Sequence, residues 1–399
     1  MKSIVASVLL CGAVLEAAPP PKKLLGIAER DAVLALVAAV DRAQLADMAP
    51  SAAAEFQFHV LKSGDRTGYV PFRVTVPAPA DAYKSAVVYV RAVSRREGRR
   101  VAGERSALRD ALLHGTMTAA RPAETAFVGP GEMPVGGPAS SSARRATAAP
   151  AEASTMLTLQ QRAYEKQKAA EDEARKRQEQ PRDPLRFPFE DYHVAALTAG
   201  KGERTIERAL ALAPGEYDVY VALIDRARLK DAAPAIVRQT VVVPDFWNDQ
   251  LVLSTLMLTA GVRTLKTTLP PQDQIEHPFA FGHAEVLPVA APVFTPNDAL
   301  SVVYQICNYG APDADLRAEY TFYHRDGGAR RLFNRTGPQE FGDVELPPTN
   351  PFETQAFAMQ TVPLAPFPPG EYELEITVRD RLTRGVASRS VTFTVSTTR

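Results

Sequence analysis

PGEYDVYVALIDR (residues 214–226) and PGEYELEITVRDR (residues 369–381) are two copies of one sequence pattern. In each copy Pro-Gly predicts a tight turn, because proline presets φ for the turn and glycine accepts positive φ. An alternating strand follows, and Asp-Arg closes it before a loop that leads to a last apolar strand, at residues 240–243 and 391–395. Such a hairpin at the end of each half predicts two similar domains of antiparallel strands.

A Pro-Gly-x-Tyr strand that pairs with a terminal strand resembles the last hairpin of bacterial immunoglobulin-like and fibronectin-like modules. In those modules the tyrosine ring lies in the core and its hydroxyl binds nearby backbone. The resemblance therefore implies structural roles for the repeated residues. These are Pro214, Gly215, Tyr217, Asp225, Pro369, Gly370, Tyr372 and Asp380.

More specifically, residues 185–396 look like the C-terminal halves of extracytoplasmic bacterial proteins that carry a von Willebrand A-type or GWxTD-type module. The similarity rests on LVLSTLML (residues 251–258), the strand that begins at Phe279, and the second PGEY copy. The chain contains no Asp-x-Ser-x-Ser motif and no Gly-Trp-x-Thr-Asp stretch. No head module is predicted, and the resemblance implies no metal-dependent adhesion here.

Short apolar or alternating segments between Gly and Pro turns predict the other strands. They lie at residues 56–60, 70–76, 86–90, 187–197, 206–212, 217–224, 236–243, 251–258, 279–286, 300–307, 316–323, 356–362, 372–378 and 391–395. This pattern predicts a mainly β chain with two immunoglobulin-like antiparallel β-sandwiches, at residues 55–246 and 249–397.

Two further segments interrupt the strand pattern. Residues 22–48 carry apolar side chains at helical spacing, which predicts an N-terminal helix docked on its own domain, with a partner-binding helix as the alternative. Residues 96–184 are rich first in Gly, Pro, Ser and Ala and then in charged residues, which predicts a disordered or helical insertion in the first sandwich. Within it, residues 160–180 favour a single solvated helix over a coiled coil, because they sustain no apolar heptad seam.

Residues 1–18 have the layout of a secretory signal peptide, with Lys2 before a charge-free apolar run. The run is too short to span a bilayer comfortably, so cleavage predicts an exported chain without a membrane span, in the periplasm, at the cell surface or secreted. A buried helix of a cytosolic protein is the alternative, and the leucines before Cys11 disfavour lipidation there. Cleavage would remove Cys11 and leave Cys307 without a partner, so no disulfide framework is predicted.

Charge and motifs argue against several functions. Lys plus Arg and Asp plus Glu number 46 each, so no net charge draws the chain to nucleic acid. The sequence has no HExxH, GxSxG, CxxC or Walker lysine loop. GKG (residues 200–202) lacks the spacing that cradles phosphate, and KSG (residues 62–64) predicts a turn because no Ser-x-x-Lys accompanies it. We therefore expect no cofactor.

Glu276, His277, His283 and Glu285 form the best candidate metal cluster, because strand alternation places His283 and Glu285 on one face. Zinc would need a third ligand from elsewhere. Solvent-facing side chains at a strand edge are the preferred interpretation, so no metal is predicted.

The repeated pairs Asp225-Arg226 and Asp380-Arg381 end the two copies of the strand. Repetition at equivalent hairpin ends favours turn hydrogen bonds and a local ion pair over catalysis.

Aromatic side chains concentrate in the second half, where exposed tyrosines would suit a glycan or protein site, although core packing accounts for most of them. They are Tyr304, Tyr309, Tyr320, Phe322, Tyr323, His324 and Phe333.

These observations together predict a non-enzymatic structural or protein-interaction module of the bacterial envelope. The alternatives are a carbohydrate-binding accessory module and a periplasmic hydrolase with an unrecognised site between the domains. The expected partner is an envelope protein or a glycan, and the sequence does not predict the oligomeric state.

Overall fold

The computed structural model describes residues 26–47, 54–63, 66–78, 82–101, 104, 106, 108–109, 187–200, 202–229, 233–269, 273, 276–310, 315–341 and 355–397. The predicted signal peptide and the predicted helix at 160–180 lie outside these residues, as does most of the predicted insertion.

The helices and strands are α1 (Ile27–Leu45), β1 (Glu55–Phe58), β2 (Leu61–Lys62), β3 (Gly68–Pro77), β4 (Ser85–Arg96), β5 (Arg99–Arg100), β6 (Phe189–Ala196), β7 (Thr198–Ala199), β8 (Glu203–Leu212), β9 (Gly215–Asp225), the 3₁₀ turn η2 (Arg226–Arg228), β10 (Ala235–Val243), β11 (Val252–Leu253), β12 (Met257–Thr264), β13 (Ala280–Phe281), β14 (Ala284–Pro288), β15 (Val293–Phe294), β16 (Ala299–Cys307), β17 (Leu316–Asp326), β18 (Ala329–Arg335), β19 (Gln339–Phe341), β20 (Gln355–Pro363), β21 (Gly370–Asp380) and β22 (Val386–Val395).

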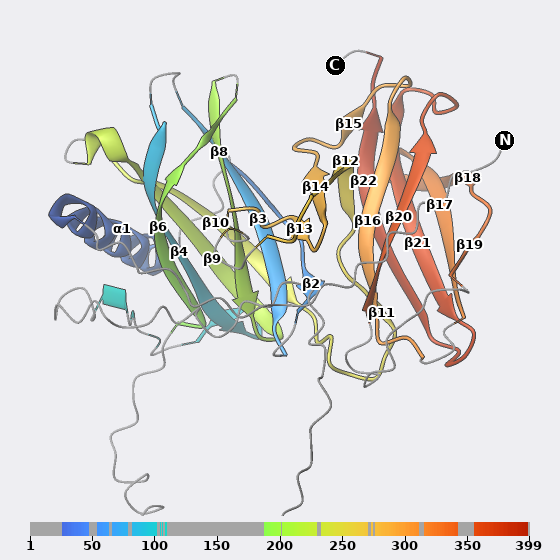
Figure 1. Ribbon diagram of the computed structural model, residues 1–399, viewed down its shortest axis with the longest axis horizontal. Coiled ribbons are helices and arrows are strands. Elements are labelled where there is room, and N and C mark those ends of the chain that lie inside the picture. The colour runs from blue at the N-terminus through green and yellow to red at the C-terminus, as the bar shows by residue number, and fades with distance from the viewer. Residues whose placement is uncertain are drawn as a thin grey trace, which may run out of the picture. The chain divides into compact units, whose positions relative to one another are not determined.

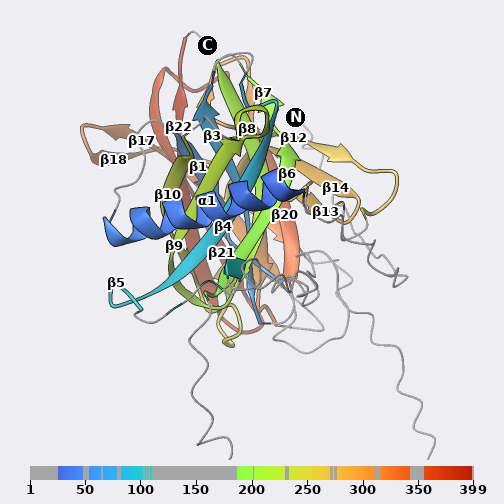
Figure 2. The same cartoon turned by 90° about the vertical axis from the view of Figure 1, so that its left-hand side faces the viewer.

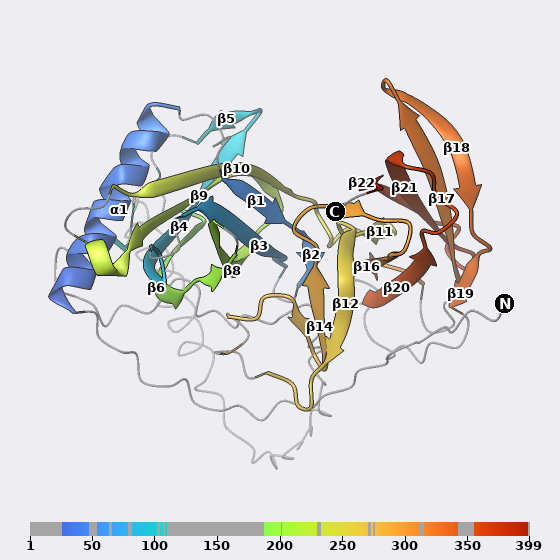
Figure 3. The same cartoon turned by 90° about the horizontal axis from the view of Figure 1, so that it is seen from above.

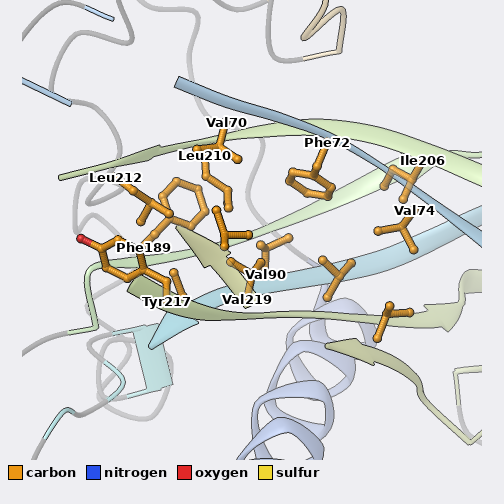
Figure 4. Packing of buried hydrophobic residues seen from close by; sticks show 14 of the residues in the cluster. Val70, Phe72, Val74, Val90, Phe189, Ile206, Leu210, Leu212, Tyr217 and Val219 are labelled. Carbon is orange, nitrogen blue, oxygen red and sulfur yellow. The ribbon is translucent and has the colours of Figure 1, made fainter. Parts of the chain in front are cut away.

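The first sandwich consists of two antiparallel sheets (Figure 1). One has the order β1-β3-β8-β7 with β2 also on β3, and the other has the order β10-β9-β4-β5 with β6 also on β4. Alternate side chains of these strands point between the sheets and form the core, part of which is seen in Figure 4. The core includes Val70, Phe72, Val74, Val90, Phe189, Ile206, Leu210, Leu212, Tyr217 and Val219.

α1 covers the outer face of the sheet that contains β4 and β9 (Figure 2). Leu36 and Val40 of the helix are buried in the same apolar cluster as Tyr220 of β9. Because Tyr217 and Val219 face the sandwich core, β9 is buried on both faces. This double burial accounts for the nearly continuous apolar run in the first PGEY copy, as in other strands that are covered on both sides.

The predicted N-terminal helix is shorter than its apolar pattern. Its first turn begins after Gly26, whose backbone N–H donates to the Glu29 carboxylate at 3.1 Å. It ends at Leu45, and a turn at residues 46–47 follows. The local hydrogen bonds at its two ends, rather than the periodicity, set these bounds.

The second sandwich repeats the arrangement (Figure 3). One sheet has the order β11-β16-β12-β14-β13 with β20 also on β16, and the other has the order β15-β22-β21-β17-β18 with β19 also on β17. All pairs are antiparallel except β15 with β22. In β21, Leu374 and Ile376 lie in the core, whereas Glu373 and Glu375 point to the partly exposed outer face. No helix of the described residues covers this face, so the second PGEY copy alternates strictly.

Polar and apolar contacts join the two sandwiches. The Lys62 ammonium donates to Asn308 Oδ1 at 2.8 Å, and the Lys62 backbone N–H donates to Gln305 Oε1 at 2.8 Å. The Tyr69 hydroxyl donates to the Pro278 carbonyl at 2.6 Å. A small apolar cluster surrounds these bonds, formed by Leu61, Tyr69, Met257, Phe279, Phe281, Val286 and Val303.

The mainly β prediction with two antiparallel sandwiches and an N-terminal helix is confirmed, but some strand predictions are wrong. The expected strand at 251–258 is divided between β11 and β12, and the expected strand at 279–286 is a hairpin of β13 and β14. β18 was not predicted, because its ARRLFNR sequence (residues 329–335) has no apolar alternation. None of the helices described is both long and apolar enough to cross a membrane.

Candidate interaction surface

The two repeated tyrosines make the same hydrogen bond in both sandwiches. The Tyr217 hydroxyl donates to the Ala213 carbonyl at 2.8 Å, and the Tyr372 hydroxyl donates to the Pro368 carbonyl at 2.7 Å. Both rings lie in the cores, where they anchor the turn that enters β9 or β21. This is the tyrosine corner of immunoglobulin-like sandwiches, and its role is structural.

The repeated glycines follow Pro214 and Pro369 and begin β9 and β21. Their φ angles are +157° and +158°, values that side chains rarely adopt. A Cβ on Gly370 would lie 2.5 Å from the His324 ring, and one on Gly215 would lie 3.2 Å from the Tyr217 hydroxyl. The glycines therefore allow close packing at the corner.

The repeated aspartates end β9 and β21 and bind backbone N–H groups. Asp225 accepts hydrogen bonds from the Tyr83 and Ala227 backbones, both at 3.0 Å. Asp380 accepts hydrogen bonds from the Gly310 backbone at 2.7 Å and the Leu382 backbone at 2.8 Å. Each carboxylate thus holds its own turn and a distant loop together.

The arginines that follow these aspartates form ion pairs with other elements rather than locally. Arg226 contacts Glu29 of α1 at 2.7 Å. Arg381 contacts Asp315 at 2.6 Å and Glu340 at 2.8 Å. These exposed pairs contribute little stability each, and they place no acid next to a base for catalysis.

The candidate metal cluster is distributed among different partners. Glu285 Oε1 lies 3.0 Å from His277 Nδ1, and its other oxygen accepts a hydrogen bond from Arg263 Nε at 2.8 Å. His283 lies in the β13–β14 turn with Nδ1 3.4 Å from the Leu265 carbonyl, so it does not share a ligand face with Glu285. Glu276 Oε1 is 3.7 Å from Arg208. No group of three His, Cys, Asp or Glu side chains suited to a metal ion occurs among the described residues.

Most of the aromatic side chains in the second sandwich are core residues. Tyr304, Tyr309, Tyr320 and Phe322 are at most 1% exposed. The Tyr304 and Tyr320 hydroxyls are 3.0 Å apart, and burial raises the pKa of Tyr320 to about 12. These four residues cannot form an external binding platform.

The remaining aromatic residues are covered in part by neighbours. The Arg330 guanidinium lies 3.7 Å from the centroid of the Tyr323 ring and contacts Glu375 at 2.6 Å. The rings of His324 and Phe333 pack on Tyr372, with centroid distances of 5.1 and 5.3 Å. A planar row of free aromatic faces, as a carbohydrate platform requires, is not present among these three residues.

Asp218 in the first PGEY copy is fully buried and is surrounded by arginines. It accepts hydrogen bonds from Arg95 at 2.8 Å, Arg100 at 2.9 Å and Arg238 at 3.2 Å. Burial opposes its ionisation, but the hydrogen bonds from Arg95 and Arg100 outweigh this and lower the pKa of the carboxyl. The Asp218 carboxylate is therefore fully engaged by the three guanidinium groups, which favours a structural role.

A second buried network joins α1 to β4 and β6. Arg91 is fully buried, contacts Asp41 of the helix at 2.7 Å and donates to the Tyr89 hydroxyl at 2.8 Å. Glu190 binds the same tyrosine hydroxyl and accepts a hydrogen bond from Ser106 Oγ at 2.5 Å. Neither network was predicted from the sequence. A strand pattern shows which residues alternate, but it does not show which outward-facing residues another element such as α1 will bury.

The strongest candidate for binding is the edge strand β20 (Gln355–Pro363), which contains no charged residue. It pairs with β16 over nine consecutive residues without a register shift. Among the described residues, no strand pairs with its opposite edge. Alternate N–H and C=O groups along that edge are therefore free of ladder bonds within the described part of the chain.

The side chains of β20 alternate between the core and the outer face. Ala358 is buried in the core, whereas Phe357 and Met359 are each 37% exposed on the other face. The Phe357 ring stacks on Phe281 of β13 with a centroid distance of 5.0 Å. An incoming strand would thus meet backbone hydrogen-bonding groups flanked by apolar side chains.

Each other long edge strand in the described part of the chain contains at least one charged residue: β10 has a single one, Arg238, and β18 and β6 have more, which discourage strand addition. β18 contains Arg330, Arg331 and Arg335 and has a register irregularity opposite β17. β6 contains Glu190 and Asp191. β20 lacks both the charges and the bulge that commonly protect exposed edges. In the sequence, β20 is recognisable only as an uncharged segment. The order of the strands in the sheet is what identifies this segment as an edge.

Comparison with known proteins gives no family assignment. No family model matches the chain, and no curated protein matches it. Among solved structures, red sea bream transglutaminase aligns with 90% of this chain and 33% of its own, at 8% identity and a TM-score of 0.21. A Salmonella alpha-2-macroglobulin variant aligns with 88% of this chain and 15% of its own, at 8% identity and a TM-score of 0.19. Escherichia coli alpha-2-macroglobulin aligns with 87% of this chain and 17% of its own, at 11% identity and a TM-score of 0.19. This chain therefore spans a third or less of each of these proteins, and similarities this weak carry no argument about function.

Proposed function

We propose that this chain is an exported, non-enzymatic envelope protein that acts as a structural or protein-interaction module and binds its partner by strand addition at β20. The observation that carries the proposal is the uncharged edge strand without a bulge, since strand addition needs free backbone groups and neighbouring side-chain contacts. The resemblance to the C-terminal halves of von Willebrand A-related or GWxTD-type proteins rests on short structural motifs, so it supports the sandwich fold and an extracytoplasmic location rather than a particular activity. The signal-peptide pattern of residues 1–18 supports export.

The side chains with acid–base chemistry support the non-enzymatic part of the proposal. Asp225 and Asp380 bind backbone N–H groups, and Glu285 is engaged by Arg263 and His277. These contacts give the three carboxylates structural roles in turns and strands, and the Arg263 guanidinium also occupies the Glu285 carboxylate that pairs with His277. The carbohydrate alternative is disfavoured, because the second-sandwich tyrosines are buried or covered.

The proposal can be tested by site-specific photocrosslinking in the native cell. A photoreactive amino acid at position 359 on β20 should give discrete adducts that mass spectrometry identifies. The matched control is position 332 on the arginine-bearing edge β18, where Leu332 is 58% exposed. Adducts from position 359 alone support binding at β20, and equal adducts from both positions or none from position 359 contradict it.

A further inference from the structure

We infer that the partner at β20 is a second copy of this chain, paired antiparallel through a twofold axis at Met359. This inference rests on the proposed function, because it names the occupant of the same edge. Strand pairing between identical edges is a common way for sheets to continue across a symmetric dimer.

The first argument is the symmetry of the strand. Met359 is the middle residue of β20, so antiparallel self-pairing places it opposite its own copy. The same register places Phe357 opposite Thr361 and Ala358 opposite Gln360. The strand is then paired along its length, with Pro363, which has no N–H to donate, at its end opposite Gln355, and each residue keeps the face that it already occupies.

The second argument is charge. A self-pairing strand brings identical residues close together, and like charges directly opposite one another are destabilising. β20 has no charged residue, and the whole chain carries 46 basic and 46 acidic residues. Two copies therefore meet without net repulsion, whereas a charged foreign strand would find no complementary charge on β20.

The third argument is the apolar surface beside the edge. Met359 and Phe357 are partly exposed on the same face of the strand, and Phe357 is supported by Phe281. In the paired register the two Met359 side chains contact each other across the axis, and each Phe357 lies next to the partner's Thr361. Flexible methionine side chains adapt readily to such a contact.

The self-pairing register predicts which cysteine variants crosslink. In a Cys11→Ser background, Met359→Cys should form an intermolecular disulfide under mild oxidation, because opposed residues have Cα atoms about 4.5–5.5 Å apart. The matched control Thr361→Cys should not, because its copies would be four residues out of register, roughly 13 Å apart. Cys307 is fully buried, so it does not compete.

Sedimentation equilibrium of the full chain should show a concentration-dependent dimer. Met359→Lys should weaken dimerisation by about tenfold or more, because two lysines would be directly opposed. The matched control Leu332→Lys on β18 should dimerise like the unmodified chain. Circular dichroism and thermal unfolding of each variant check that the fold is retained.

Dimerisation that Met359→Lys weakens, together with a disulfide from Met359→Cys alone, supports the inference. A monomer at all concentrations, or equal disulfide yields from Met359→Cys and Thr361→Cys, overturns it. Adducts from position 359 to a foreign protein, with the isolated chain monomeric, would overturn the second-copy inference and leave the proposed function standing.

Discussion

His59 should make the stability of this protein depend on pH between about 4 and 6.5. Its Nδ1 atom is buried and has no hydrogen-bond partner among the described residues, and its ring packs edge-on against Phe279 at a centroid distance of 6.1 Å. Burial, with a smaller contribution from the nearby Arg73 charge, lowers the pKa of His59 from 6.5 to about 4. The folded protein therefore keeps this side chain neutral at pH values where the unfolded chain protonates it.

The direction of the effect follows from proton binding. At pH 7.5 neither state protonates His59, so its titration does not change the free energy of unfolding there. As the pH falls from 6.5 towards 4, the unfolded chain binds a proton that the folded protein excludes, so the free energy of unfolding decreases. The two pKa values predict a loss of roughly 2–3 kcal/mol between pH 7.5 and 4.5. Asp218, whose carboxyl pKa is lowered, begins to contribute near the acidic end of this range, but it is present in all the proteins compared and therefore does not change their difference.

The measurement is urea unfolding, followed by circular dichroism, at pH 7.5 and pH 4.5. The test variant is His59→Phe, which removes the titrating group, and the matched control is His283→Gln at a partly exposed turn. The unmodified protein and the control should lose roughly 2–3 kcal/mol more than His59→Phe on acidification. If all three proteins lose the same stability, His59 is not the source and its neutral burial does not control the pH dependence.

Three other substitutions test the structural assignments in equilibrium unfolding. Tyr372→Phe removes the corner hydrogen bond and should lower the free energy of unfolding by about 1 kcal/mol, and an unchanged value would contradict the corner's role. Asp218→Asn removes the buried carboxylate that Arg95, Arg100 and Arg238 share, whose own side chains are at most 20% exposed, and should cost about 3–5 kcal/mol, whereas Asp47→Asn, at a side chain 78% exposed, should cost under about 1 kcal/mol. Gly370→Ala should cost about 1–3 kcal/mol because its φ of +158° disfavours a side chain and its Cβ meets His324, while Gly337→Ala, which has neither a positive φ of this kind nor a heavy atom within 4 Å of the added carbon, should cost less; equal costs would show that the backbone conformation and the close contact do not matter.

Much of the strand content could be predicted because it depends on local sequence. The Pro-Gly turns, the alternating strands after them and the repeated aspartates all follow from short-range backbone and side-chain preferences. The fully apolar β9 was recognisable as a strand too. The packing of α1 on β9 could not be predicted. The apolar pattern of the helix does not specify which face of which sheet the helix packs against.

The candidate surface could not be predicted for a similar reason. QAFAMQTVP (residues 355–363) predicts a strand, but its position at a sheet edge depends on pairing with β16, which lies more than forty residues earlier in the chain. β18 was missed because ARRLFNR has no apolar alternation, and its strand follows a turn at Gly327 and Gly328. His283 and Glu285 do not share one face, as strand alternation predicted, because the chain turns at His283.

The two PGEY copies explain why α1 packs on the first sandwich while no described helix packs on the equivalent strand of the second. In β9 the outward positions include Tyr220 and Ala222, and α1 packs on them. The equivalent positions in β21 are Glu375 and Thr377, which are partly exposed on a face that no helix of the described residues covers. In the first sandwich, α1 thus occupies the outer face of the sheet that contains β9. A strand that joins the second sandwich at β20 meets neither that helix nor a charge on the edge, so it can extend the sheet without burying an unpaired ion.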